Sequence, residues 1–175
     1  MLVTIGAGFM SSLDLFVVNV AFDQIATDFG VGSSGGPTAS DMSCVLNAYA
    51  VTFAALLVPF GRLADRYGRK SIFIGGLVLF VAASAACAFR GGVWALVRVL
   101  QAAGAAAMTP TSLSILMGSL PPEKRLGAIR LWSAIGAIAA ALGPSVGGVL
   151  TQISWHWVFL INLPIGLVLL WFAVR

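Results

Sequence analysis

Charged residues are scarce in this chain of 175 residues. They make up 9% of the sequence, whereas a typical soluble domain carries about 25%. Hydrophobic residues make up 59%, and the mean hydropathy is +1.00. Water is therefore not the main solvent of this chain, which excludes an ordinary soluble domain.

The chain is also poor in the residues that build metal and catalytic sites. The spacing of its two cysteines, Cys44 and Cys87, does not match a metal site or a disulfide framework. Its single histidine, His156, has no other ligand type at a suitable spacing. No nucleophile is paired with a base, and no loop suits a nucleotide. The sequence therefore predicts no enzyme and no metal site.

Six apolar segments are each long enough to cross a bilayer, which takes about 20 mainly apolar residues. The breaks between them, among them Gly30–Ser43, Arg90–Gly92 and Leu120–Arg125, carry Gly, Pro, Ser or charged residues, as turns do. The sequence therefore predicts an all-α membrane protein with six transmembrane helices. The predicted spans are Leu2–Ile25, Cys44–Phe60, Ser71–Phe89, Val93–Met117, Leu126–Gln152 and Trp157–Val174.

Lysine and arginine gather on one side of this topology. The other side holds only Arg90, and Arg98 lies inside the fourth span. Because cytoplasmic loops are rich in Lys and Arg, both chain termini are predicted to be cytoplasmic. The asymmetry also explains the basic pI, about 9.7, without nucleic acid as a partner. The cations of the predicted cytoplasmic side are Arg62, Arg66, Arg69, Lys70, Lys124, Arg125, Arg130 and Arg175.

The densest charge cluster is Gly61–Lys70, which reads Gly-Arg-Leu-Ala-Asp-Arg-Tyr-Gly-Arg-Lys. Its position between two long apolar runs predicts a tight loop at the membrane surface. The stretch resembles the signature G-x-L-A-D-R-x-G-R-K, which the major facilitator superfamily carries between its second and third helices. This resemblance implies a latch against a second half of the transporter, formed by Gly61, Asp65, Arg66, Gly68, Arg69 and Lys70. The alternative role of Asp65 is to balance the surrounding cations.

Asp14 lies near the middle of the first predicted span. A carboxylate at the bilayer centre costs at least about 2.5–3.5 kcal/mol on insertion scales, so it should face the bundle interior. It is either a protonatable group, a counter-charge for a cationic substrate, or part of a structural ion pair. The surrounding stretch Leu13–Ala21 resembles the signature L-D-x-T-V-V-N-V-A of the fourteen-span drug:proton antiporters, with Phe16 in place of the threonine.

Arg98 lies inside the fourth span and shares one helix face with Gln101. Because an unpaired charge inside a span is costly, Asp14 and Arg98 are predicted to face one interior site. The alternative is an arginine that reaches the outer interface. The run Arg98–Ala106 resembles R-x-x-Q-G-x-G-A-A, whose arginine is tied to proton coupling in the family. The resemblance therefore implies a coupling site of Asp14, Arg98 and Gln101, with a proton gradient as the energy source and no cofactor.

The fifth span contains a cluster of helix-weakening residues, Gly143, Pro144, Gly147 and Gly148. Proline removes a helix hydrogen bond and glycine permits close packing, so a kink is predicted here. The cluster resembles the antiporter signature G-x-x-x-G-P-x-x-G-G, which implies export. The alternative is a plain packing kink. Trp155–Gly166 further resembles W-R-W-x-F-x-I-N-x-P-I-G at the start of the sixth span in the same subfamily.

These motifs cover nearly the whole chain in order. The resemblance implies that residues 1–175 are the N-terminal half of a major facilitator fold, with two inverted three-helix repeats, and that the C-terminal half is absent. The expected function is proton-coupled efflux of cationic or lipophilic small molecules by alternating access in a bacterial plasma membrane. The alternatives are export of a metabolite or self-made antibiotic by the same fold, or a truncated membrane protein that does not transport.

Overall fold

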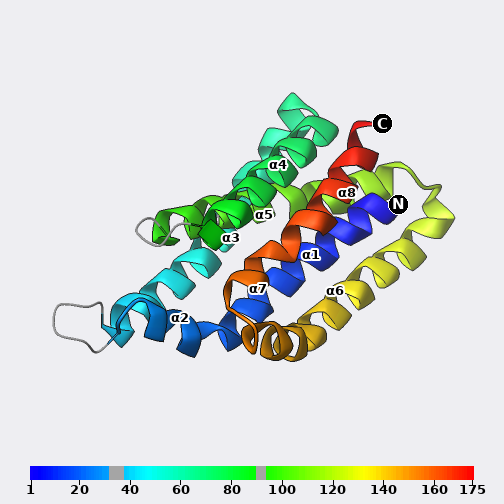
Figure 1. Cartoon of the computed structure of the whole chain (residues 1–175). Helices are drawn as coiled ribbons and strands as arrows, with labels where there is room; N and C mark the ends of the chain where they lie inside the picture. Colours follow the sequence, from blue (N-terminus) through cyan, green and yellow to red (C-terminus); the bar gives the residue numbers. More distant parts are fainter. Residues whose placement is uncertain (32–37, 90–93) are drawn as a thin grey trace.

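The computed structural model describes residues 1–31, 38–89 and 94–175 (Figure 1). Within these ranges every regular element is a helix, and six helical segments are long and apolar enough to cross a membrane. The prediction of an all-α membrane bundle is confirmed. The helices are α1 (Leu2–Val20), α2 (Phe22–Asp28), α3 (Ala39–Tyr67), α4 (Arg69–Phe89), α5 (Trp94–Gly118), α6 (Pro122–Thr151), α7 (His156–Leu160) and α8 (Asn162–Val174).

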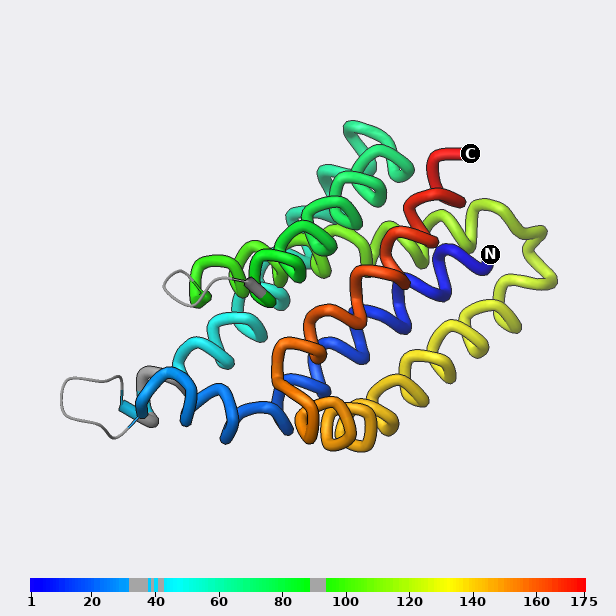
Figure 2. The backbone as a smooth tube through the Cα atoms, viewed as in Figure 1, coloured from blue at the N-terminus to red at the C-terminus, as the bar shows by residue number. Residues whose placement is uncertain are grey.

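Helices α1 and α5 form the centre of the bundle. Helix α1 packs against α5, α6 and α8, while α5 packs against α3 and α4. The two are the most deeply buried of the long helices, and α3 is the least. The first and last helices, α1 and α8, lie side by side, and the two chain termini lie at the same end of the bundle (Figure 2). A side chain on α1 or α5 is therefore the best placed to be shielded from the surroundings.

The prediction of a tight loop over Gly61–Lys70 is wrong in its extent. Helix α3 continues through this stretch to Tyr67, and α4 begins directly after Gly68. Gly68 has a φ of 95°, the left-handed conformation that commonly ends helices and that glycine adopts at little cost. The residues before it include Arg, Leu and Ala, which have high helix propensity. These residues therefore continue α3, and Gly68 alone forms the turn between α3 and α4.

Two predicted spans end or divide earlier than expected. The first helix stops at Val20, five residues short of the predicted Ile25, and α2 follows after Ala21. The Ala21 N–H donates to the Val18 carbonyl over 3.1 Å, a tighter bond than the helical pattern gives. The sixth span is divided at Ile161 into α7 and α8. Such local turns leave the hydropathy of a segment unchanged, so the apolar pattern does not reveal them.

The predicted breaks are shorter than expected where the structure describes them. Helix α6 begins at Pro122, inside the predicted break Leu120–Arg125, because proline suits the first turn of a helix. Helix α3 begins at Ala39, inside the predicted break Gly30–Ser43. The predicted turn Arg90–Gly92 lies outside the described residues.

Small residues, among them Gly76 and Gly104, bring α4 and α5 into close contact. A Cβ atom added to Gly104 would lie 2.7 Å from the backbone nitrogen of Phe80 and 2.8 Å from the carbonyl oxygen of Gly76. No side chain fits in that space. Backbone contact of this kind is typical of helices packed within lipid, where small interface residues permit close approach.

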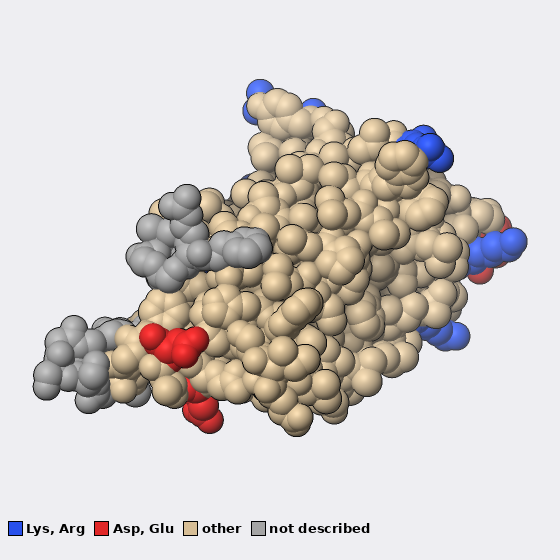
Figure 3. Space-filling view, viewed as in Figure 1, with Lys and Arg blue, Asp and Glu red and all other residues tan. Residues whose placement is uncertain are grey.

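Opposite ends of the bundle differ in charge. In the space-filling view of Figure 3, lysine and arginine side chains gather at the end that carries the chain termini. Acidic side chains show at the other end, where Asp23 and Asp28 belong to α2. Helix α2 is held there by hydrogen bonds from Gln24 to the Thr151 carbonyl and from the Trp155 indole to Asp28. The bundle therefore has a basic end, rich in Lys and Arg, where Asp65 and Glu123 also lie, and an opposite end that carries the acids of α2.

Candidate functional site: a buried ion pair between α1 and α5

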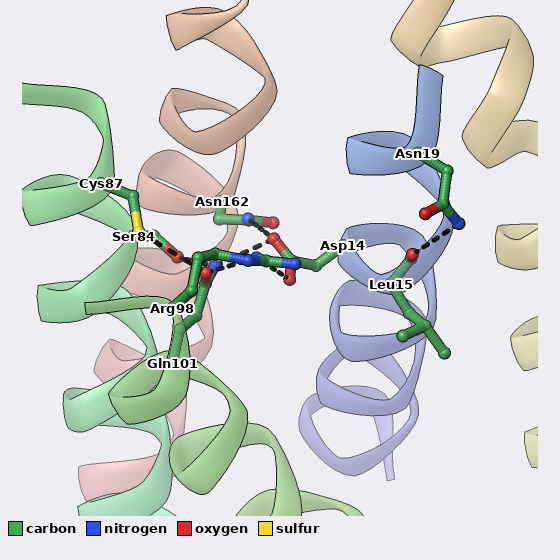
Figure 4. A network of polar contacts seen from close by, with 8 residues as sticks. All are labelled: Asp14, Leu15, Asn19, Ser84, Cys87, Arg98, Gln101 and Asn162. Carbon is green, nitrogen blue, oxygen red and sulfur yellow. Dashed lines mark hydrogen bonds and ion pairs between the residues drawn. The ribbon is translucent and has the colours of Figure 1, made fainter. Parts of the chain in front are cut away.

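The two charges predicted inside membrane spans form an ion pair. Arg98 Nη1 on α5 donates to Asp14 Oδ2 on α1 over 2.9 Å. The exposed fraction of the side chain is 2% for Arg98 and 0% for Asp14. Central helices carry both residues, so the pair lies inside the bundle (Figure 4). Arg98 therefore pairs inside the bundle in this structure, instead of reaching the outer interface.

Gln101 connects the two charges. Its Nε2 donates to Asp14 Oδ1 over 2.9 Å, and its Oε1 accepts from Arg98 Nη1 over 2.6 Å. The same Nε2 donates to Ser84 Oγ on α4 over 2.7 Å, and the Cys87 thiol lies 3.9 Å from Oε1. One amide thus bridges the carboxylate and the guanidinium. The shared helix face of Arg98 and Gln101 suggests that they lie close together, but it does not predict this bridge.

Asn162 is a member of the site that the sequence did not single out. Its Nδ2 donates to Asp14 Oδ1 over 2.9 Å, and its side chain is fully buried. Asn162 is the first residue of α8, so the turn at Ile161 places it against α1. The signal was present in the resemblance, because Asn162 occupies the asparagine of the sixth-span signature. With this bond, Asp14 accepts hydrogen bonds from three different side chains.

Two aromatic rings lie close to the guanidinium of Arg98. Its Cζ atom lies 4.1 Å from the ring centre of Tyr49 on α3 and 5.4 Å from that of Phe159 on α7. Both rings are buried. The face of an aromatic ring attracts a cation, most strongly where water is excluded. Arg98 is therefore held by an acid, an amide and aromatic faces together.

This arrangement stores two opposite charges in a water-poor site without leaving either uncompensated. Breaking such a pair by removing one partner is strongly destabilising. The site therefore links α1 and α5 through two charges that depend on each other. Among the described residues, no group of three or more His, Cys, Asp or Glu is arranged to hold a metal ion.

The residues of the predicted latch form a separate, exposed region at the basic end. Arg69 Nη2 donates to Asp65 Oδ1 over 3.1 Å, and both side chains are about half exposed or more. Arg66 lies over the Tyr67 ring, and Gly68 makes the turn. Asp65 thus pairs with one of the surrounding cations, as its alternative role requires. The structure contains no second half against which the latch prediction could be compared.

The predicted kink residues divide into two faces of α6. Gly143 and Gly147 are buried against α1. A Cβ added to Gly143 would lie 2.7 Å from Phe16 Cβ, and one added to Gly147 would lie 2.8 Å from the Val17 carbonyl oxygen. Gly148 has open space where its Cβ would be. Pro144 is exposed, and α6 runs unbroken through it. Two of these residues therefore bring α6 against the helix that carries Asp14, and the kink itself stays a prediction.

The six spans and their buried ion pair are those of a multi-pass membrane protein. The chain belongs to the major facilitator superfamily, whose family model matches residues 4–175. The prediction of this family, made from the charged stretch and the span motifs, is confirmed.

Its relatives include proteins named for drug resistance. The chain is 42% identical to the Methylenomycin A resistance protein of Bacillus subtilis (strain 168), over 99% of this chain and 37% of that protein. It is 39% identical to the Putative multidrug resistance protein MdtD of Salmonella newport (strain SL254), over 91% of this chain and 33% of that protein. The chain thus spans about a third of the length of these relatives.

A solved structure shares the fold. The crystal structure of a bacterial homolog of the human lysosomal transporter Spinster, inward-facing and unoccupied, matches with a TM-score of 0.76 and 21% identity. The match covers 99% of this chain and 42% of that one. At this identity the likeness supports the fold alone.

Proposed function

We propose that this chain is the N-terminal half of a proton-coupled exporter of small molecules that works by alternating access. The observation that carries the proposal is the ion pair of Asp14 and Arg98, fully buried between the two central helices. A charge inside a membrane span is costly and commonly marks a substrate or proton pathway. The drug-resistance names of the relatives favour efflux as the direction.

In the proposed mechanism, Asp14 alternates between two states. As a carboxylate it holds Arg98, Gln101 and Asn162 around it and ties α5 and α8 to α1. When it takes up a proton, the attraction to Arg98 ends, and the helices are free to move relative to one another. A cationic substrate competes with the proton for the same carboxylate, so binding of one favours release of the other.

The proposed function includes an orientation of the bundle in the membrane. The basic end of the bundle faces the cytoplasm of a bacterium, in accordance with the distribution of Lys and Arg in membrane proteins. Both termini lie at that end (Figure 1). The residues Gly61–Lys70 then lie on the cytoplasmic side, where they contact a second half of the transporter. The chain has no catalytic role in this proposal.

A second candidate keeps the fold and narrows the cargo to one compound. The observation that favours it is the name of the Bacillus subtilis relative, and of a Streptomyces coelicolor relative 40% identical over 90% of this chain, which both refer to methylenomycin A alone. A broad exporter transports both ethidium and methylenomycin A, whereas a dedicated one transports only the second compound.

The test uses proteoliposomes with an imposed pH gradient. We expect this chain, joined to a second half taken from the Bacillus subtilis relative, to move ethidium against its gradient until a protonophore collapses the pH difference. The chain without a second half should be inactive because it contains one side of a two-sided pathway. Transport that continues after the collapse, or transport by this chain alone, would contradict the proposal.

A further inference from the structure

Helix α3 packs against α5 and α4 but buries few of its own side chains. Of its residues whose burial the structure describes, Tyr49 and Ala64 alone are buried. Val51 and Val58 are 66% and 65% exposed, so most of the helix faces away from the bundle.

Tyr49 is the large side chain that α3 inserts into the bundle, and it lies on the ion pair. Its side chain is 1% exposed, and its ring centre lies 4.1 Å from Arg98 Cζ. Phe53, one turn further along α3, stacks on it with an angle of 5° between the ring planes. The aromatic pair thus forms the wall of the site on the α3 side.

The hydroxyl group of Tyr49 makes no well-aligned hydrogen bond, although it lies close enough to Asp14 to interact with it. The guanidinium of Arg98 attracts the ring. Both contacts hold Tyr49 over the pair, so displacement of the ring exposes Asp14 and Arg98 together.

We propose that the Tyr49 ring is the cover of the Asp14–Arg98 pair, and that movement of α3 opens the pair to water and to cargo. Tyr49 is then a positioning residue, because it acts through the access of other molecules to Asp14. The ring does this, since it is the ring that contacts Arg98. For coupled transport this role rests on the proposed function, but the covering itself is measurable without transport.

The chain contains its own reporter for this opening. Cys87 is fully buried, and its thiol lies 3.9 Å from Gln101 Oε1, the atom that accepts from Arg98. The second cysteine, Cys44, is exposed on α3 itself. A small uncharged thiol reagent, methyl methanethiosulfonate, therefore probes the covered site at Cys87 and the free surface at Cys44 in the same sample.

The experiment compares three proteins in lipid: the unsubstituted chain, Tyr49→Ala and Tyr49→Phe. Modification of each cysteine is followed in time by mass spectrometry. We expect Cys87 to react about tenfold faster or more in Tyr49→Ala, which corresponds to about 1.4 kcal/mol in the free energy of opening. In Tyr49→Phe, which keeps the ring, the rate at Cys87 should stay that of the unsubstituted chain. The rate at Cys44 should be the same in all three.

Three results would overturn the proposal. Equal rates at Cys87 in all three proteins would show that Tyr49 covers nothing, and equal acceleration in both variants would assign the cover to the hydroxyl. If circular dichroism shows that Tyr49→Ala does not fold, Tyr49→Leu replaces it. A rate of Cys87 modification in Tyr49→Leu no higher than in Tyr49→Phe would then refute the role of the aromatic face. None of these results depends on coupled transport, so the proposed function is tested separately by efflux.

Discussion

Removing both charges of the buried pair should harm the fold less than removing one of them. Breaking a buried ion pair from one side costs about 3–5 kcal/mol, because the remaining charge is left without its partner. The variants are Asp14→Asn, Arg98→Gln and the double variant, and the measurement is the free energy of unfolding in lipid or detergent.

The surroundings of the pair place the single variants at the lower end of that range. In Arg98→Gln, the carboxylate keeps two amide donors, from Gln101 and Asn162. In Asp14→Asn, the guanidinium keeps the Gln101 carbonyl oxygen and the aromatic faces. We therefore expect each single variant to lose about 3 kcal/mol. The double variant leaves no charge alone, so it should lose less than either, about 1–2 kcal/mol for the altered hydrogen bonds.

The control is Asp23→Asn, which makes the same chemical change on the exposed surface of α2 and should be nearly silent. If the double variant loses as much stability as the two single variants together, within about 0.5 kcal/mol, the two charges do not stabilise each other. The same double variant, in a transporter completed by its second half, should fold but lose efflux driven by a pH gradient. Normal gradient-driven efflux would end the proposal that this pair couples proton to cargo.

Three further predictions concern other parts of the bundle. Asp65→Asn should change the free energy of unfolding by only about 0–1 kcal/mol, because its ion pair is exposed. If Asp65 belongs to a latch, efflux by the completed transporter should nevertheless fall steeply. Unchanged efflux would favour simple charge balance. Gly104→Ala should cost about 1–3 kcal/mol, because the new methyl group meets the backbone of α4, whereas Gly148→Ala, with open space, should be nearly neutral; equal thermal stability of the two variants would refute the close packing of α4 and α5. Cysteines placed at the exposed positions Ser71 and Gln152 should react with an impermeant thiol reagent from opposite sides of the membrane, and reaction of both from outside would contradict the orientation.

The sequence predicted those features whose free-energy cost depends on a few residues within one segment. An aspartate and an arginine inside apolar spans each need a partner, so their approach was predictable from two residues alone, Asp14 and Arg98. The number and order of spans were likewise predictable, because the bilayer sets the length of each segment. The family followed from the dense charged stretch around Asp65.

What could not be predicted depends on geometry between distant residues. Asn162 stands 148 residues from Asp14 along the chain, and nothing in its own segment shows which helix it will meet. Tyr49 looks like an ordinary apolar residue of its span, yet it lies on a guanidinium 4.1 Å away. The extent of α3 differs from the prediction because charge is typical of a loop, whereas helix propensity and the left-handed conformation of Gly68 decide where this helix ends.

The distance between the paired charges along the chain has a consequence for biosynthesis. Arg98 follows Asp14 by 84 residues, and at about 5–20 residues per second the ribosome needs about 4–17 seconds to make that length. During this interval Asp14 has been made while its partner does not yet exist. The nascent protein therefore holds an uncompensated acid, and its assembly in the membrane is completed only when the fourth span arrives. A nascent chain arrested before Arg98 should remain more accessible to membrane proteases than one arrested after it.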